Sequence, residues 1–212
     1  KPKLCVSHTE QAWHQAEPRQ SFWSNQEKGI KMEDIRKVFT IQWVGPFESF
    51  ASLYKYLNDP NTCDCHLFSF YYCSGSKKGK GYPINKDDYR YFGLHRSETP
   101  IHMRVAPWHE HLRNFREPFS LWIGSFSDSI QQTPENIEDV ETVFISTYKD
   151  VLTENTQKKK ATPKESICII NLWYRSNEQR WLNKKRDIKV FDDVLVYEAE
   201  SMTYSKGNLS IV

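Results

Sequence analysis

The chain has 212 residues, of which 26% are charged, and a formal net charge of +2 at pH 7. This length is enough for one hydrophobic core with an elaborated edge. No apolar stretch approaches the roughly 20 residues that a membrane-spanning helix needs, and the first residues lack the apolar segment of a signal peptide. Five unevenly spaced cysteines are typical of a reduced, intracellular protein. The sequence therefore predicts an intracellular protein with no membrane partner.

The predicted elements form one domain that follows a polar arm. Residues 1–35 lack clean periodicity and form the arm, and residues 36–212 form the single domain. Alternating or apolar runs predict strands at residues 37–44, 65–73, 89–93, 119–126, 167–174 and 188–197. Helices are predicted at residues 46–57, 107–115 and 134–152. This order favours an α+β fold in which helices flank a small, mainly antiparallel sheet.

Glu141 lies within the apolar stripe of the third predicted helix. Thr133 can cap this helix and Pro134 suits its first position. The apolar residues recur at spacings of three and four, at Ile137, Val140, Phe144, Ile145, Tyr148 and Val151. A carboxylate on this face needs a partner, because burying an unpaired charge is costly. A metal ion, an arginine or a bound substrate could supply it; the alternative is a structural ion pair with an internal arginine or lysine.

Lysines gather in short runs although the net charge is small. Two of these runs lie in a glycine-rich loop and after the third predicted helix, at Lys77, Lys78, Lys80, Lys158, Lys159 and Lys160. Local basic patches attract polyanions, so we expect these lysines to bind a nucleic-acid backbone. The loop at residues 74–81 is not a Walker loop, because it lacks the G-K-[ST] ending. Solvated loop lysines and a simple flexible hairpin connection are the alternatives.

Four residues around the second predicted strand have side chains that zinc favours: Cys63, Cys65, His66 and Cys73. Their C-x-C-H spacing is narrower than that of structural zinc sites, and Cys65 and His66 would point to opposite faces of a strand. The segment at residues 109–111, His-Glu-His, also differs from the H-E-x-x-H motif, whose histidines lie four apart on one helical face. The sequence therefore does not favour zinc.

A set of short motifs follows in one order along residues 60–156. In chain order the set contains Phe68 and Tyr72 in one strand, Tyr91-Phe92-Gly93 in the next, and then Arg104, His109, Glu141 and Asn155. This order resembles the GIY-YIG nucleases, especially the restriction-enzyme branch with a long loop between the two strand motifs. The resemblance implies a GIY-YIG-like core with N- and C-terminal elaborations.

The resemblance also implies a role for the polar members of this set. Glu141 would bind the metal ion, Arg104 would contact the scissile phosphate, and Tyr91 would position water or phosphate. Asn155, which follows the acidic helix, would support the site. Each residue has a plainer structural role as its alternative: sheet core for Tyr91, a surface or paired arginine for Arg104, and a helix-end residue for Asn155.

Two positions depart from the family's pattern. Phe68 stands where the family has its first catalytic tyrosine, and a phenylalanine cannot donate or accept a proton. Tyr71 or Tyr72 could substitute, the enzyme could be weak or inactive, or a tyrosine could have been replaced to trap a substrate. The gap between the arginine and His109 is one residue longer than usual, so His111 is an alternative for the family's histidine.

The set as a whole suits phosphodiester hydrolysis, which needs a nucleophilic water and stabilisation of charge on the phosphate. One Mg²⁺ on a carboxylate can organise the phosphate, and an arginine can hold its oxygens. We therefore expect a Mg²⁺-dependent endonuclease that acts on DNA, with restriction-type specificity as one form. RNA is an alternative partner, and a homodimer would suit a palindromic duplex. The other candidates are a non-catalytic nucleic-acid-binding or regulatory protein on a degenerate nuclease scaffold, and a protein-interaction domain with a structural Glu141.

Overall fold

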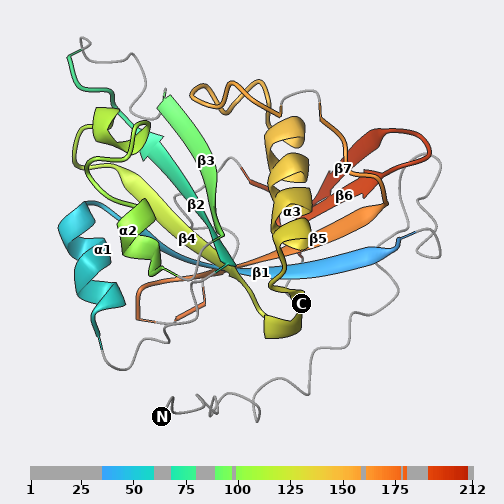
Figure 1. The fold of residues 1–212 in the computed structure, drawn as a ribbon, viewed down its shortest axis with the longest axis horizontal. Helices are drawn as coiled ribbons and strands as arrows, with labels where there is room; N and C mark the ends of the chain where they lie inside the picture. The colour runs from blue at the N-terminus through green and yellow to red at the C-terminus, as the bar shows by residue number, and fades with distance from the viewer. Residues whose placement is uncertain are drawn as a thin grey trace.

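The described part of the chain forms one seven-stranded sheet with helices packed against it (Figure 1). The structure is a computed structural model that describes residues 35–59, 68–79, 89–96, 99–158, 161–177, 179–180 and 191–209. The strands are β1 Lys37–Phe47, β2 Phe68–Gly75, β3 Tyr89–Arg96, β4 Ser120–Phe126, β5 Ile167–Tyr174, β6 Val194–Glu198 and β7 Thr203–Gly207. The helices are α1 Phe50–Leu57, α2 Ile101–Arg104 and α3 Pro134–Thr147, with short 3₁₀ helices η4 Leu112–Asn114 and η5 Ser129–Gln131.

The strand order is β3-β2-β4-β1-β5-β6-β7, and neighbouring strands are mostly antiparallel. Among the described strands, β1 and β5 at the centre form the parallel pair, with Lys37 opposite Ile167 and Val44 opposite Tyr174. The predicted α+β class and the mainly antiparallel sheet are confirmed. The sheet is larger than the small sheet that we expected, because β7 has mostly polar, exposed residues that give no strand signal.

Two hydrophobic cores lie on opposite faces of the sheet, because successive strand residues point to opposite sides. The α3 core contains the apolar side of α3 and the large rings of Trp43, Phe92, Trp122 and Trp173. The other core, which we call the α2 core, contains Leu53 of α1, Ile101 of α2 and residues of the segment 105–119. In Figure 1, α3 lies apart from α1 and α2, which cover the β3-β2-β4 end of the sheet.

The helix boundaries follow from their caps rather than from the apolar pattern alone. The predicted helix at 46–57 begins only at Phe50, because β1 continues to Phe47 and Ser49 caps the helix through the backbone of Ser52. Thr133 caps α3 as predicted, with its hydroxyl accepting from the backbone N–H of Asn136 at 3.2 Å.

The predicted helix at residues 107–115 is wrong. This segment holds a turn that His109 closes on Ala106, and then the 3₁₀ helix η4, while α2 lies before it at Ile101–Arg104. Pro107, the first residue of the segment, suits the turn, because it fixes φ for the second turn position. The apolar residues of this segment therefore pack against the sheet from a turn and a 3₁₀ helix, with no α-helix in the segment.

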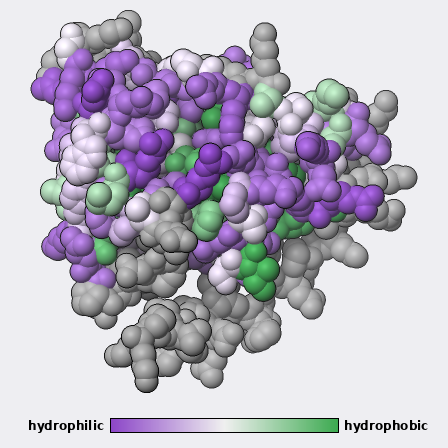
Figure 2. Space-filling view, viewed as in Figure 1, coloured by the Kyte–Doolittle hydropathy of each residue, from purple (hydrophilic) through white to green (hydrophobic). Residues whose placement is uncertain are grey.

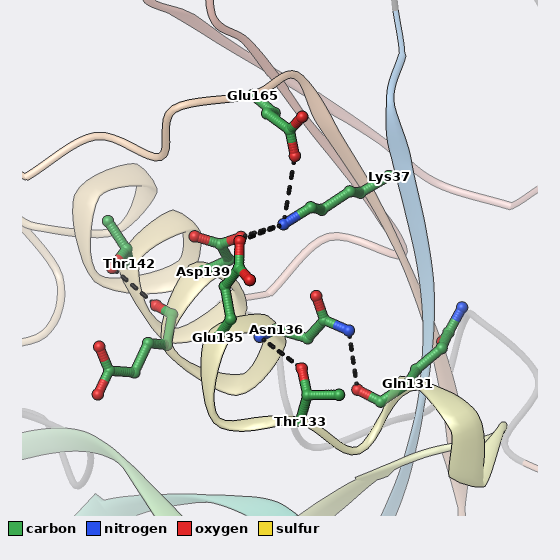
Figure 3. A network of polar contacts seen from close by, with 9 residues as sticks. Lys37, Gln131, Thr133, Glu135, Asn136, Asp139, Thr142 and Glu165 are labelled. Carbon is green, nitrogen blue, oxygen red and sulfur yellow. Dashed lines mark hydrogen bonds and ion pairs between the residues drawn. The ribbon is translucent and has the colours of Figure 1, made fainter.

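A cluster of charges joins three segments that are far apart in the sequence (Figure 3). The ammonium of Lys37 at the start of β1 lies 3.1 Å from a carboxylate oxygen of Glu135 and 2.9 Å from one of Asp139, both on α3. It also lies 3.3 Å from a carboxylate oxygen of Glu165, just before β5. Since the lysine and Asp139 are largely buried, this cluster fixes the N-terminal half of α3 over the central parallel pair.

Hydrophilic residues cover most of the surface that Figure 2 shows. The large apolar side chains that the described residues expose are few, and they are Val38, Met103, Trp108, Ile130 and Met202. No helix in the described ranges has the length and apolar character needed to cross a membrane. The arm predicted at residues 1–35 lies outside the described residues except for Ile35.

Candidate functional site

Tyr71 and Tyr91 lie side by side in the α2 core, on the two strands of the hairpin that β2 and β3 form. Their ring centroids are 5.9 Å apart, and both side chains are buried. The pairing register produces this contact: Tyr71 pairs with Gly93, so Tyr91 lies two residues away on the same face of the sheet. Two phenol groups therefore face the segment that carries Arg104 and His109.

His109 is hydrogen-bonded to Tyr71, with 3.0 Å between the imidazole Nε2 and the hydroxyl oxygen. The other ring nitrogen, Nδ1, lies 3.3 Å from the backbone nitrogen of His111 and 3.4 Å from that of Leu112. Because both of those N–H groups are donors, Nδ1 accepts, and a neutral ring then carries its proton on Nε2. His109 therefore donates to the Tyr71 hydroxyl, whose own proton is left to donate onward.

The electrostatics of this cluster keep its groups uncharged at neutral pH. Burial, together with the charge of Arg104 and the neighbouring His111, lowers the pKa of His109 to about 4. Burial likewise raises the pKa of Tyr71 well above its usual value, although Arg104 acts in the opposite direction. The pKa of Tyr91 is raised mainly by burial, while a hydrogen bond from Tyr71 lowers it. Neutral His109, Tyr71 and Tyr91 thus form a chain of hydrogen bonds.

Gly93 allows the Tyr71 ring to occupy its place over β3. A Cβ atom at position 93 would lie 2.4 Å from Cζ and 2.5 Å from the hydroxyl oxygen of Tyr71. Any other residue there would push the phenol away from His109 and Tyr91. A glycine is therefore needed at the third position of the Tyr91-Phe92-Gly93 motif, because any side chain there would overlap the Tyr71 ring on the neighbouring strand β2.

Arg104, the last residue of α2, is exposed. Its charge acts on Tyr71, Tyr91 and His109, which places the guanidinium close to all three. In the described part of the chain, no carboxylate forms an ion pair with Arg104. An exposed guanidinium next to neutral hydrogen-bond donors is suited to holding an anion such as a phosphate.

Glu141 forms an ion pair with Lys158. Its carboxylate lies 2.7 Å from the ammonium of Lys158, and 13% of the Glu141 side chain is exposed, against 31% for Lys158. The charge of Glu141 nevertheless reaches Tyr91 and contributes to the raised pKa of that phenol. Glu141 lies on α3, whose core is on the other face of the sheet from that of Tyr71 and Tyr91, and its ion-pair partner is Lys158.

Asn155 supports the edge strand β3. Its side-chain oxygen accepts from the backbone N–H of Phe92 at 2.9 Å, and its amide donates to the carbonyl of Phe92 at 2.7 Å. Nearby, the backbone N–H of Glu154 donates to the carbonyl of Arg90 at 3.0 Å, so this segment contacts the backbone of β3 at a second point. The buried amide of Asn155 thus fixes the residue that follows Tyr91, and acts on the cluster through the backbone.

Phe68 and Tyr72 lie on the other face of the sheet from this cluster. Both pack in or against the α3 core, because they are separated from Tyr71 by odd numbers of residues along β2. The structure therefore does not bring these two candidates together with Tyr91 and Arg104. His111 does join the cluster, since its ring stacks on that of Tyr91 with centroids 4.3 Å apart.

The predicted lysines divide into three groups. Lys77 is paired with Glu154 at 3.0 Å, Lys158 is paired with Glu141, and Lys78 is exposed. Lys80, Lys159 and Lys160 lie outside the described residues, as do Cys63, Cys65 and His66.

Arg113 and Arg116 were not predicted as part of this region. The backbone N–H of Arg116 donates to the carbonyl of Ser76 at 2.7 Å, and that of Lys78 to the carbonyl of Asn114 at 2.7 Å. These bonds place the two arginines beside the basic loop. No local pattern in the sequence indicates this pairing, because β3 and α2 lie between the two segments.

Within the described ranges, no group of three or more histidine, cysteine, aspartate and glutamate side chains is arranged to hold a metal ion. Comparisons of the chain with family models, with curated proteins and with solved structures find no match. The functional argument therefore rests on the geometry of the cluster around Tyr71 and Tyr91.

Proposed function

We propose that the chain is a Mg²⁺-dependent endonuclease that hydrolyses DNA phosphodiester bonds on a GIY-YIG-like core. The observation that supports this most is the convergence of Tyr71, Tyr91, Arg104 and His109 at one place, with the charge of Glu141 acting on the same tyrosine. The elements that carry these residues also follow each other in the order that the resemblance implies. An intracellular protein with a DNA partner suits the two free cysteines of the described chain.

In this proposal Arg104 holds the non-bridging oxygens of the scissile phosphate, because it is exposed and lies beside neutral donors. Tyr91 orients the attacking water or a phosphate oxygen, and the hydrogen bond from Tyr71 holds the Tyr91 hydroxyl in place. His109 holds Tyr71 in the orientation that makes this donation possible. The surrounding residues therefore fix protons and charge around the phosphate rather than supply a covalent nucleophile.

Glu141 would hold the metal ion. Mg²⁺ is usually bound by one or two carboxylates together with waters and substrate phosphate, so a single glutamate beside a phosphate site fits this ion. A bound Mg²⁺ would supply charge stabilisation at the phosphate and at the leaving oxygen. Lys158 would then have to release Glu141, and its ammonium would be free to meet the DNA backbone.

The test is nicking of supercoiled plasmid in Mg²⁺ by the chain and by paired tyrosine variants. Tyr71→Phe should lower the rate by about 10²–10⁴-fold, the usual worth of a positioned acid–base group. Tyr72→Phe removes the same atom from the adjacent residue on the other face and should leave the rate near that of the wild type. Phe68→Tyr should give no gain, because its hydroxyl would lie on the α3 side.

Arg104→Ala and Glu141→Gln should each abolish Mg²⁺-dependent cutting while thermal unfolding shows an intact fold. Equal loss in the Tyr71 and Tyr72 variants would contradict the assignment of the α2 face. Salt-sensitive DNA binding without any cutting would instead support the non-catalytic scaffold, which the Glu141–Lys158 pair favours. A homodimer would be needed only to cut both strands of a palindromic site.

A further inference from the structure

Trp108 stands out among the described aromatic side chains, because 67% of it is exposed to solvent. It lies at the tip of a turn in which the backbone N–H of His109 donates to the carbonyl of Ala106 at 3.0 Å. Pro107 occupies the second position of this turn, where its fixed φ is favoured. Ala106 and His109, the two ends of the turn, are both buried, so the backbone that carries the exposed indole is anchored on either side.

The exposed charged residues near Trp108 in the sequence are mainly cationic, although Glu110 is acidic and its carboxylate lies 3.2 Å from the imidazole of His111. Arg104, the last residue of α2, lies four residues before Trp108 and is exposed, and the backbone N–H of Arg113 donates to the carbonyl of His109 at 2.9 Å. Through the pairing of residues 76–78 with residues 114–116, Lys78 and Arg116 also lie on this side. An exposed ring within a mainly basic surface differs from a protein-binding patch, whose centre is depleted of charge.

We propose that Trp108 stacks on a nucleobase of the strand whose phosphate Arg104 holds. The protein would then take a substrate in which a base is unstacked at the site, either single-stranded DNA or a locally opened duplex. Aromatic stacking beside cations is a sequence-tolerant way to hold single strands, because every base presents a π-face. This inference rests on the proposed function and specifies the form of the substrate that the same site takes.

The experiment measures the affinity of the full chain for three probes at low salt without Mg²⁺. The probes are single-stranded oligothymidylate, the same strand annealed to oligoadenylate, and an abasic deoxyribose-phosphate strand of equal length. Trp108→Ala should bind oligothymidylate about 5- to 150-fold more weakly, the loss expected for one stacked base. Trp108→Phe should keep most of the affinity. Ile130→Ala, which truncates an exposed apolar residue elsewhere, serves as the matched control and should change nothing.

The abasic strand separates stacking from charge. Wild type and Trp108→Ala should bind it equally, whereas Arg104→Ala should weaken the binding of all three probes. Equal weakening of the abasic and base-bearing strands by Trp108→Ala would overturn the stacking role. Unchanged affinity for oligothymidylate would do the same, and a simultaneous change in the self-association of the free chain would indicate a protein contact instead. If the wild type binds no probe at all, the proposed function fails together with the inference.

Discussion

At the scale of single residues, the position of one proton decides how the tyrosine pair can act. Because the His109 Nδ1 accepts from the backbone, its Nε2 donates to Tyr71, and the Tyr71 proton is directed to Tyr91. A protonated His109 would need a second acceptor at Nδ1, where two N–H groups already point. The fold therefore opposes the charging of this histidine.

This opposition predicts acid sensitivity. The pKa of His109 is about 4 in the folded chain against an ordinary 6.5, so the unfolded chain binds more protons between these values. The stability that the fold owes to a neutral His109 is therefore fully present above pH 6.5, and it is lost as the pH falls towards 4. We expect the free energy of unfolding, measured with urea, to fall by about 2 kcal/mol from pH 7 to pH 5 through this group. His95, whose pKa is also lowered by burial, adds a loss of the same sign.

His109→Gln provides the control for this prediction, because glutamine keeps a donor but does not titrate in this range. Its unfolding free energy should vary less between pH 7 and pH 5 than that of the wild type. Identical pH profiles for the two proteins would show that His109 titrates normally in the fold.

Lys158 gives a second prediction at this scale. Its ammonium is the partner of the Glu141 carboxylate, so it competes with any cation for the same oxygens. Lys158→Ala should therefore increase the rise in Tm that Mg²⁺ produces, since ligand binding to the folded state stabilises it. Adding Glu141→Gln to this variant should abolish the rise. A Lys158→Ala protein whose Tm ignores Mg²⁺ would identify Glu141 as a purely structural residue.

At the scale of elements, the hairpin of β2 and β3 assembles the site through its register. The sequence showed that tyrosines lie on both strands, but it could not show which of them meet. Alternation along β2 separates Tyr71 from Phe68 and Tyr72, and only the pairing of Tyr71 with Gly93 identifies the tyrosine that faces Tyr91. The position of the motif along one strand therefore predicted Phe68 as the residue in the place of the first tyrosine, whereas the pairing between the strands identifies Tyr71 as the tyrosine beside Tyr91.

The same register predicts a coupling between Gly93 and Tyr71. Gly93→Ala should destabilise the fold by about 1–3 kcal/mol, the usual effect of overpacking, because the new methyl group overlaps the phenol ring. In a Tyr71→Ala background the same change should cost little. Urea unfolding of the four proteins gives the coupling energy, for which we expect about 0.5–3 kcal/mol. Additive effects would mean that the Tyr71 ring does not lie over Gly93.

Elements with a strong pattern and a clear cap were predictable from the sequence. β5 agrees with its predicted range, and α3 begins at Pro134 as its cap indicates. The segment that carries Trp108 and His109 was not predictable, because its apolar residues serve a turn and a 3₁₀ helix whose shape depends on the sheet beneath them. Local patterns do not contain that information.

At the scale of the whole molecule, the net charge is only +2, so binding to DNA would depend on local groups of cations. Arg113 and Arg116 are exposed beside the basic loop, while Lys206 is exposed on β7 at the other end of the sheet. We expect the affinity for duplex DNA to fall by about 0.9 log unit per tenfold rise in salt for each phosphate contacted. Arg113→Ala and Arg116→Ala should each reduce this slope by about one unit.

Lys206→Ala is the matched control for charge alone and should leave the salt slope unchanged. Filter binding or anisotropy across a salt series measures all four proteins. Equal slopes for the arginine variants and the wild type would place the DNA elsewhere on the surface.

The parallel pair at the centre of the sheet also governs when the chain can fold. β1 pairs with β5, and the β1 residues of this pair lie opposite residues about 130 positions later, so a ribosome must deliver most of the chain before β1 gains its second neighbour. Until then the growing polypeptide holds β1 with one open edge, where unpaired backbone groups favour association with other chains. Nascent copies of this protein should therefore depend on chaperones until β5 emerges.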